Sequence, residues 1–298
     1  MLPDLERLIQ LQQLDTAADE ARRTVDGIPS RIEDLDTRLR TSTTAVDAAG
    51  TRLGDKKNKR QTLEKSLAEV QGRRLLDWTL HAFGENRALP LGPDNICFVG
   101  GYQIERVQLE YPGFTFRNND NWQNNNILGS LFYAEDVMQD GFLCAYSDIL
   151  FTPEAVEHAL ANHADAVLVI DTEWLAHYAE RSQHPTDDGE KVTVANGLIT
   201  RIERCTPEAE VYGEYTGVAK FTAAGAGRLR EYYHRCREQF AGRPFREAKV
   251  FEKAYLIHLF QHMIEAGEEF AHADIPGDYR EIDTQEDFEL AQKNWPDG

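Results

Sequence analysis

Cysteine is scarce in the 298-residue sequence, and its few copies lie far apart. The four thiols are Cys97, Cys144, Cys205 and Cys236, and no CxxC pair occurs among them. Structural zinc sites need clustered ligands, and disulfides are rare in reducing compartments. The sequence therefore argues against a zinc site and predicts buried free thiols in a reducing compartment.

Long apolar runs are also absent. No stretch of 18 apolar residues occurs, and the opening MLPDLERLIQ contains no apolar core of the kind found in secretory signals. The mean hydropathy of -0.54 describes a polar chain. We therefore expect a soluble, cytoplasmic protein without a membrane segment.

Basic residues are few beyond the first quarter of the chain. Residues 1–74 hold 14 Lys+Arg and 13 Asp+Glu, whereas the other 224 residues hold 18 and 38, which produces the net charge of -19. Nucleic acids and anionic membranes are bound through Lys and Arg that neutralise phosphates. We therefore expect no nucleic-acid or membrane partner, although an acidic body tolerates a cationic substrate.

An apolar stripe with heptad spacing runs through residues 28–70. With Ser42, Lys56 and Arg60 in the remaining positions, its members are Ile28, Ile32, Leu35, Leu39, Val46, Ala49, Leu53, Leu63, Leu67 and Val70. Such a stripe is typical of a coiled coil and cannot bury itself within one helix. We predict a coiled coil over residues 1–74, interrupted at 27–29, that forms a homodimer or receives a partner helix. The alternative is a solvated helical spacer.

The same segment resembles the start of the bacterial coiled-coil proteins that carry a C-terminal zinc ribbon. The resemblance lies in LIQLQQLD (8–15), IPSRIEDLDTRL (28–39) and LEKSLAEVQGR (63–73). In that family a return helix and a CxxC-type ribbon follow, and neither follows here. The partner-binding role of those parts is therefore not implied for this chain.

Residues 75–298 alternate between strand and helix patterns. Strands are predicted at 95–101, 114–116, 142–146, 164–170, 192–195, 198–202, 214–221 and 279–283, and helices at 75–83, 102–109, 127–138, 224–240, 247–266 and from 285. Asn196-Gly197 is the strongest hairpin signal in the chain. Alternation of this kind predicts a second domain at 75–298 with an α/β, Rossmann-like, mostly parallel sheet.

Asp148 lies in the apolar run GFLCAYSDILF at 141–151, at the point where the strand predicted at 142–146 should stop. The run is nearly continuous, which predicts a strand buried on both faces, and Thr152-Pro153-Glu154 then predicts the start of a helix. A carboxylate at the carboxyl end of a parallel strand lies where open α/β sheets bind ligands. The alternative is that Asp148 only stabilises a turn.

Six motifs stand in an order and spacing that resemble the phosphocholine cytidylyltransferase-like branch of the sugar-phosphate nucleotidyltransferases. They are VGGYQIERV (99–107), NNNILGSLFYAEDV (124–137), YSDILF (146–151), VLVIDTEW (167–174), GEYTGVAKF (213–221) and REIDTQEDFELA (280–291). The resemblance covers about residues 69–298. It implies a nucleotidyltransferase-type sheet and CTP-dependent transfer of a nucleotidyl group to phosphocholine or a similar alcohol phosphate or phosphonate, with release of pyrophosphate.

The resemblance also implies roles for individual residues. Asp148 and Asp283 match the carboxylates that hold Mg²⁺ in the family. Three groups match other parts of its site: Gly100, Gly101 and Tyr102 near the nucleotide base; Asn125, Asn126 and Ser130 in a nucleotide-facing loop and helix start; and Asp171, Lys191, Glu214 and Tyr215 in the acceptor pocket. For the acceptor group the alternative is ordinary surface polarity. Acidic and aromatic side chains there can hold a cationic head group through charge and cation–π contact.

One part of the family pattern does not occur in this sequence. The family opens with a strand and a glycine-rich loop that binds the triphosphate, followed by a proline-lysine pair. Lys65 stands in register with that lysine, but Glu64 replaces the proline and no such loop precedes it. We expect an apolar gap in the sheet where the first strand is missing. The alternative function is therefore a coiled-coil interaction protein with a catalytically inactive, nucleotidyltransferase-like body.

Overall fold

The chain separates into two compact units, Met1–Thr62 and Leu63–Gly298. The computed structural model describes residues 65–84 and 92–296, together with residues 11, 14–19, 22, 23, 25, 26, 28, 31 and 32. The described residues of the first unit are helical, and their large apolar side chains are 45–68% exposed. Most of the heptad stripe lies outside the described residues, so the coiled coil stays a prediction.

Residues 65–74 belong to the second unit, where they form a short hairpin instead of the helix that the heptad stripe predicts. A 3-10 turn, Lys65–Leu67, precedes β1 (Glu69–Val70) and β2 (Arg73–Arg74). Gln71 and Gly72 have φ of 52° and 76°, a left-handed turn that suits a two-residue hairpin. Val70 is fully buried against Trp78 and Trp295. Burial against the body therefore outweighs the local helical spacing.

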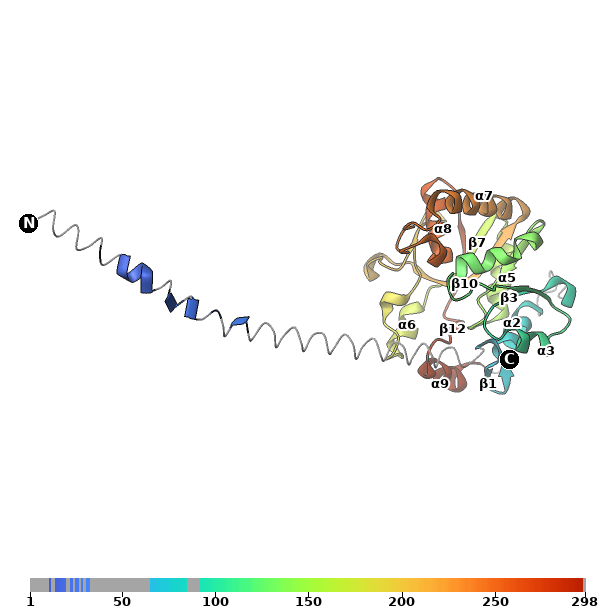
Figure 1. Ribbon diagram of the computed structural model, residues 1–298. Helices are drawn as coiled ribbons and strands as arrows, with labels where there is room; N and C mark the ends of the chain where they lie inside the picture. Colours follow the sequence, from blue (N-terminus) through green and yellow to red (C-terminus); the bar gives the residue numbers. More distant parts are fainter. Residues whose placement is uncertain are drawn as a thin grey trace, which may run out of the picture. The chain divides into compact units, whose positions relative to one another are not determined.

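A six-stranded sheet forms the centre of the second unit (Figure 1). Its order is β5-β10-β7-β11-β9-β8, and the strands are β5 (Gly141–Cys144), β7 (Ala166–Asp171), β8 (Lys191–Ala195), β9 (Leu198–Glu203), β10 (Gly213–Thr222) and β11 (Ala271–Ile275). Within this sheet the β7–β11 pair is parallel, and all the other pairs are antiparallel. The described sheet is therefore mixed, and the prediction of a mostly parallel sheet is wrong.

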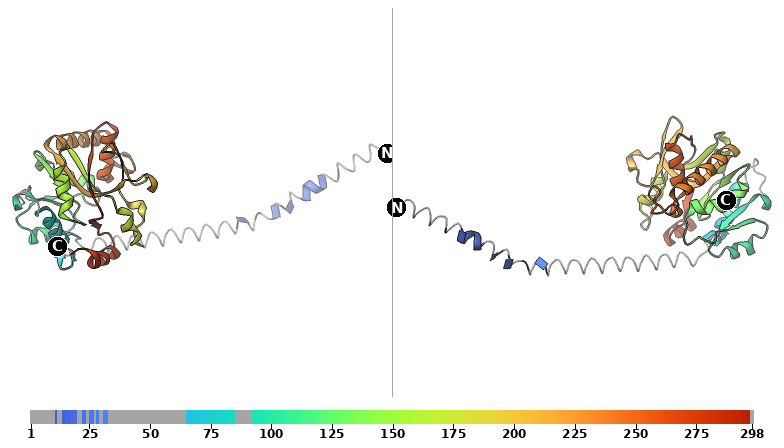
Figure 2. Two further views of the ribbon diagram at one scale, coloured as in Figure 1. Left: turned by 180° about the vertical axis from the view of Figure 1, so that it is seen from behind. Right: turned by 45° about the horizontal axis from the view of Figure 1, so that its top comes forward.

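Helices cover both faces of this sheet (Figures 1 and 2). Leu168 and Ile170 of β7 point into the core shared with α4 (Ile127–Leu131), α7 (Ala223–Phe240) and α8 (Leu256–Glu265). Val167 and Val169 point into the core shared with α2 (Leu75–Gly84) and α5 (Pro153–Ala161). This alternation explains the continuous apolar run in β7, since both faces of a central strand are buried. The α/β prediction is confirmed.

The remaining elements flank the sheet. Two short ladders are formed by β3 (Cys97–Gly100) with β4 (Thr115–Asn118), which are parallel, and by β6 (Ile149–Phe151) with β12 (Tyr279–Glu281), which are antiparallel. The other helices are α3 (Ile104–Glu110), α6 (Trp174–Ala179) and α9 (Gln285–Asn294). Thr284 caps α9 as expected, with its hydroxyl accepting from the backbone N–H of Asp287. No helix among the described residues is long and apolar enough to cross a membrane.

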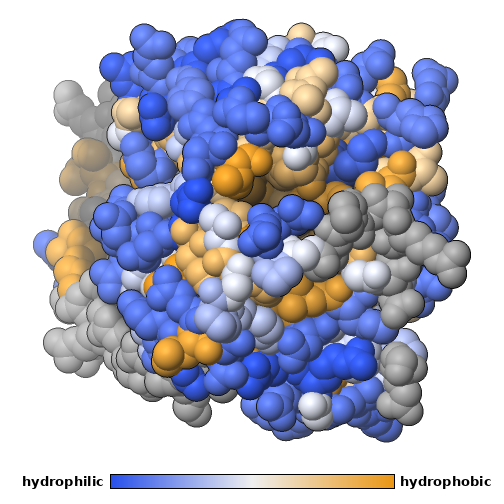
Figure 3. All heavy atoms as spheres, turned by 90° about the vertical axis from the view of Figure 1, so that its right-hand side faces the viewer, coloured by the Kyte–Doolittle hydropathy of each residue, from blue (hydrophilic) through white to orange (hydrophobic). Residues whose placement is uncertain are grey.

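An apolar groove of about 600 Å³ lies between β3 and β5. Phe98 and Val99 line one wall and Phe142 and Leu143 the other, with Phe83 of α2 nearby. Figure 3 shows apolar side chains in a hollow on the side of the unit that carries α2 and α3. β3 pairs with β4 and β5 with β10, and within residues 65–84 and 92–296 no strand pairs with their other edges. The groove agrees with the expected gap in the sheet.

Candidate functional site

Asp148 and Asp283 meet at one point of the second unit. Asp148 directly precedes β6 and Asp283 follows β12, so the antiparallel β6–β12 ladder brings them together across 135 positions of sequence. The backbone N–H of Ile282 donates to the carbonyl of Asp148 at 2.9 Å, which extends this ladder to the two carboxylates. The strand before Asp148, β5, is a half-buried edge strand antiparallel to β10, which corrects the expectation of a parallel strand buried on both faces.

The Lys65 ammonium lies between the two carboxylates. Its Nζ atom is 2.9 Å from Asp148 Oδ2 and 2.6 Å from Asp283 Oδ1, and all three side chains are mostly buried. Lys65 is held here because the hairpin that follows it packs on α9. The backbone N–H of Gln71 donates to the side-chain oxygen of Gln292, and the side-chain amide of Gln292 donates to the carbonyl of Glu69. Two carboxylates aimed at one cation are a donor set that Mg²⁺ accepts. Asp148 and Asp283 therefore fit the ion that the resemblance implies.

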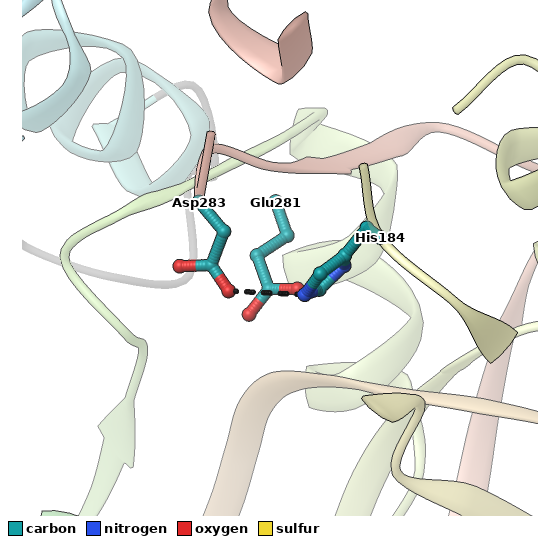
Figure 4. Close-up of side chains that lie close together, drawn as sticks. All are labelled: His184, Glu281 and Asp283. Carbon is teal, nitrogen blue, oxygen red and sulfur yellow. Dashed lines mark ion pairs between the residues drawn. The ribbon is translucent and has the colours of Figure 1, made fainter. Parts of the chain in front are cut away.

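Two further side chains that the sequence analysis missed lie beside Asp283. Glu281 and His184 each bring a ligand atom within 4.8 Å of the others and of Asp283 (Figure 4). Burial raises the pKa of Glu281 well above its ordinary value, and the negative charges of Asp283 and Asp148 raise it further. The spacing Glu281-x-Asp283 is a signal that could have been used, since residues i and i+2 of a strand share a face. No local pattern marks His184.

A side chain at either of the two glycines predicted near the base, Gly100 and Gly101, would collide with neighbouring atoms. A Cβ at Gly101 would lie 2.5 Å from Cβ of Trp122 and 2.7 Å from the carbonyl oxygen of Asn119. The Tyr102 ring packs against Trp122 with centroids 5.4 Å apart. Glycine is therefore required here for close packing of the chain, whatever the nucleotide does.

Asn119, buried at 3% exposure, links the two predicted nucleotide-binding segments. Its backbone N–H donates to the carbonyl of Gly100 at 2.7 Å, and its side chain exchanges two hydrogen bonds with Asn125 and donates to Ser130. Asn126 caps α4 by accepting from the N–H of Ile127. The structure thus brings Gly100 and the 125–130 segment together, through a residue that the sequence analysis did not select.

Asp171, Glu214 and Lys191 lie side by side on β7, β10 and β8. Glu214 is paired in register with Asp171 on one side and with Lys191 on the other. Asp171 is fully buried and accepts from the backbone N–H groups of Glu173 and Gly277, while Lys191 donates to the carbonyl of Arg204. Asp171 and Lys191 therefore have structural partners, and none of the three is a surface group.

Glu214 is the member of this group with the most altered acidity. The Tyr178 hydroxyl donates to it at 2.7 Å, and burial raises the pKa of Glu214 to about 7. Tyr215, the next residue, points to the opposite face of the sheet and packs against Tyr146 and Phe260. The structure therefore places Glu214 and Tyr215 on different sides of β10.

Glu190 is a second buried acid that the sequence analysis missed. Its Oε2 atom accepts from the Tyr146 hydroxyl at 3.4 Å, and its Oε1 atom lies 3.7 Å from the Arg204 guanidinium. Burial raises the pKa of Glu190 to about 7, which Arg204 partly opposes. Tyr146 also lines the apolar groove, together with Ser130 and Ser147. The groove therefore reaches α4 and Ser147, the residue next to Asp148.

Comparisons with known proteins show what the chain is similar to in sequence and in fold. No family model matches the chain. The CTP:phosphoglutamine cytidylyltransferase of Campylobacter jejuni is 22% identical over 236 residues, which are 76% of this chain and 90% of that protein.

Two solved structures share the fold. The inositol-1-phosphate CTP transferase of T. maritima aligns with a TM-score of 0.55 at 19% identity, over 78% of this chain and 87% of that one. The CTP:phosphocholine cytidylyltransferase of Streptococcus pneumoniae aligns with a TM-score of 0.53 at 14% identity, over 77% and 88%. Identity at this level shows the fold alone. The second unit of this chain therefore has the fold of the cytidylyltransferase-like nucleotidyltransferases, which it resembles in sequence as well.

Proposed function

We propose that the chain is a cytoplasmic nucleotidyltransferase that transfers a cytidylyl group from CTP to a small phosphorylated or phosphonate acceptor. The observation that carries this proposal is the convergence of Asp148 and Asp283 on one cation position. The fold of the second unit and the activities for which its relatives are named support the choice of reaction and of CTP. The four cysteines, which are all free, support a reducing compartment.

The chemistry is an in-line displacement at phosphorus. An oxygen of the acceptor phosphate forms a bond to the α-phosphorus of CTP, and the bond from that phosphorus to the bridging oxygen breaks, so that pyrophosphate leaves with the electron pair. Such reactions depend on positioning and on neutralising charge. Bound Mg²⁺ would supply most of that neutralisation between the phosphate oxygens. Asp148 and Asp283 would hold the ion, and the Lys65 ammonium would turn to a phosphate oxygen.

For the acceptor we propose phosphocholine or a similar alcohol phosphate or phosphonate with a cationic head group. Glu190 and Tyr146 support this choice, because a buried acid beside an aromatic ring favours a cation. A cation beside Glu190 would lower the pKa of that carboxyl group from about 7 and hold it ionised. Phosphoglutamine, the acceptor named for the Campylobacter relative, is the competing choice.

The test is an assay of pyrophosphate release by the purified full-length protein. CTP and Mg²⁺ are offered with phosphocholine, 2-aminoethylphosphonate or phosphoglutamine in turn, and we expect release with one of them. Asp283→Asn should lower the rate at least about 100-fold, because it removes charge at the position where the phosphates meet the cation. Asp140→Asn, which changes an exposed acid elsewhere, should leave the rate unchanged.

A second candidate is an interaction protein whose nucleotidyltransferase-like body is inactive. The observation in its favour is the groove between β3 and β5, which agrees with the absence of the family's first strand and triphosphate loop. No pyrophosphate release with any nucleoside triphosphate and acceptor, from protein that unfolds cooperatively, would support this candidate and reject catalysis.

A further inference from the structure

His184 lies between two carboxylates at unusual distances. Its Nε2 atom is 3.5 Å from Asp283 Oδ2 and 3.4 Å from Asp188 Oδ2. It reaches this position from the loop after α6, which ends at Ala179, whereas Glu281 and Asp283 come from the end of β12. Figure 4 shows His184 pointing toward Asp283 and Glu281.

These distances do not suit hydrogen bonds. An N–H···O hydrogen bond is about 2.7–3.2 Å long, so 3.4 and 3.5 Å are too great. Ligand atoms at the corners of a tetrahedron, each about 2.1 Å from a metal ion, are themselves about 3.4 Å apart. His184 Nε2 and Asp283 Oδ2 are therefore spaced as two ligand atoms are around a small cation, and Glu281 brings a third ligand atom within 4.8 Å.

Asp283 uses its two oxygens in different directions. Oδ1 contacts the Lys65 ammonium, and Oδ2 is turned to His184. A cation beside His184 therefore need not displace Lys65. Two carboxylates, those of Asp148 and Asp283, contact this ammonium, and Glu281 brings a third carboxyl group within 4.8 Å of Asp283.

We propose that His184, Glu281 and Asp283 form a second cation site, distinct from the one between Asp148 and Asp283. An imidazole nitrogen with two carboxylates suits a divalent transition ion better than Mg²⁺, which prefers oxygen ligands. Asp283 bridges the two positions, as carboxylates do in sites with two metal ions. Mn²⁺, Co²⁺ and Zn²⁺ are the ions of this class.

The test uses Mn²⁺ alone with the full-length protein, without nucleotide. Mn²⁺ binding is titrated by electron paramagnetic resonance, and pulsed measurements on the bound ion detect coupling to a coordinated imidazole nitrogen. We expect nitrogen coupling in the wild type. His184→Ala should lose this coupling and bind Mn²⁺ at least about tenfold more weakly. Zn²⁺ should displace the bound Mn²⁺.

His234→Ala is the matched control, because His234 also faces a carboxylate, with Nε2 2.6 Å from Glu135 Oε1 on another part of the surface. It should keep both the affinity and the nitrogen coupling. Thermal unfolding of each variant checks that it is folded. Absence of nitrogen coupling in the wild type, or its persistence in His184→Ala, would overturn the proposal. A protein without pyrophosphate release that keeps the coupling would reject the proposed function and leave this site standing.

Discussion

Val70 tests whether residues 65–74 belong to the α/β body, as the structure has them, or to a helical segment, as the heptad stripe predicts. Its side chain is fully buried in a small core with Leu75, Trp78, Leu150 and Trp295. In a coiled coil the same side chain would contact another helix, and its truncation would leave the body unchanged. The perturbation is Val70→Ala in the full-length protein.

The expected loss of stability follows from the burial. The substitution removes two carbon groups, each contributing about 0.8 kcal/mol when buried, and it leaves a cavity that the neighbouring rings fill only in part. We therefore expect a loss of about 2–3 kcal/mol in the free energy of unfolding. For a unit of this size, about 1 kcal/mol lowers the melting temperature by about 2–4 °C. The main calorimetric transition should thus fall by roughly 5–10 °C.

Val137→Ala is the control, because Val137 is 44% exposed and the same two groups are removed at the surface. Its transition should stay within about 0.5 kcal/mol of the wild type. A Val70→Ala protein whose main transition coincides with that of the control would refute the placement of the hairpin in the body. A change in the state of association without a change in this transition would support the helical assignment instead.

Two further predictions concern a buried acid and a crowded glycine. Burial raises the pKa of Glu190 from 4.5 to about 7, so the folded protein holds a proton that the unfolded chain releases, and this residue lowers stability as pH rises from about 4.5 to 7. The free energy of unfolding of Glu190→Gln, relative to that of the wild type, should therefore rise by up to about 3 kcal/mol between pH 5 and pH 8, measured by urea unfolding. A difference between the two proteins that does not change with pH would contradict this. Gly101→Ala should lower the free energy of unfolding by about 1–3 kcal/mol, because its Cβ would lie 2.5 Å from Cβ of Trp122. Gly92→Ala is the control, because a Cβ there meets nothing within 4 Å. Equal melting temperatures for the two variants would argue against this packing.

Local signals predicted the elements with the clearest local chemistry. Asn196-Gly197 predicts the β8–β9 hairpin because both residues adopt positive φ, at 53° and 78°, which few other pairs tolerate. The continuous apolar run of β7 and the capping sequence of α9 were equally informative. The strand β11 was missed, although Ala271, Ala273 and Ile275 alternate with His272 and Asp274. That strand shows the period-two alternation of a half-buried strand, and the sequence analysis did not use this signal.

Strand order could not be read in the same way. β10 follows β5 by about 70 residues, yet it lies between β5 and β7 and reverses the expected direction of pairing. No property of Gly213–Thr222 alone specifies these neighbours, since the pairing depends on how two cores fill on opposite faces. Tertiary packing decided the sheet.

The part of the candidate site that could be predicted consists of residues that lie in a family motif. Asp148, Asp283 and Lys65 were selected by resemblance, and the structure brings both carboxylates within hydrogen-bond distance of the Lys65 ammonium. Glu190 and His184 were not selected, because the features that distinguish them arise only on folding. Glu190 is marked by its burial, and His184 by its place beside Asp283, which lies 99 positions further along the chain.

Two cysteine thiols line the groove between β3 and β5. Cys97 lines one wall and Cys144 the other, and both are free. Burial raises the pKa of the Cys97 thiol. Burial also raises the pKa of the Cys144 thiol, to about 12, so both thiols are protonated near neutral pH and react slowly with electrophiles. Their alkylation rates therefore report on access to the groove from both sides. A compound or peptide that fills it would protect the two thiols together.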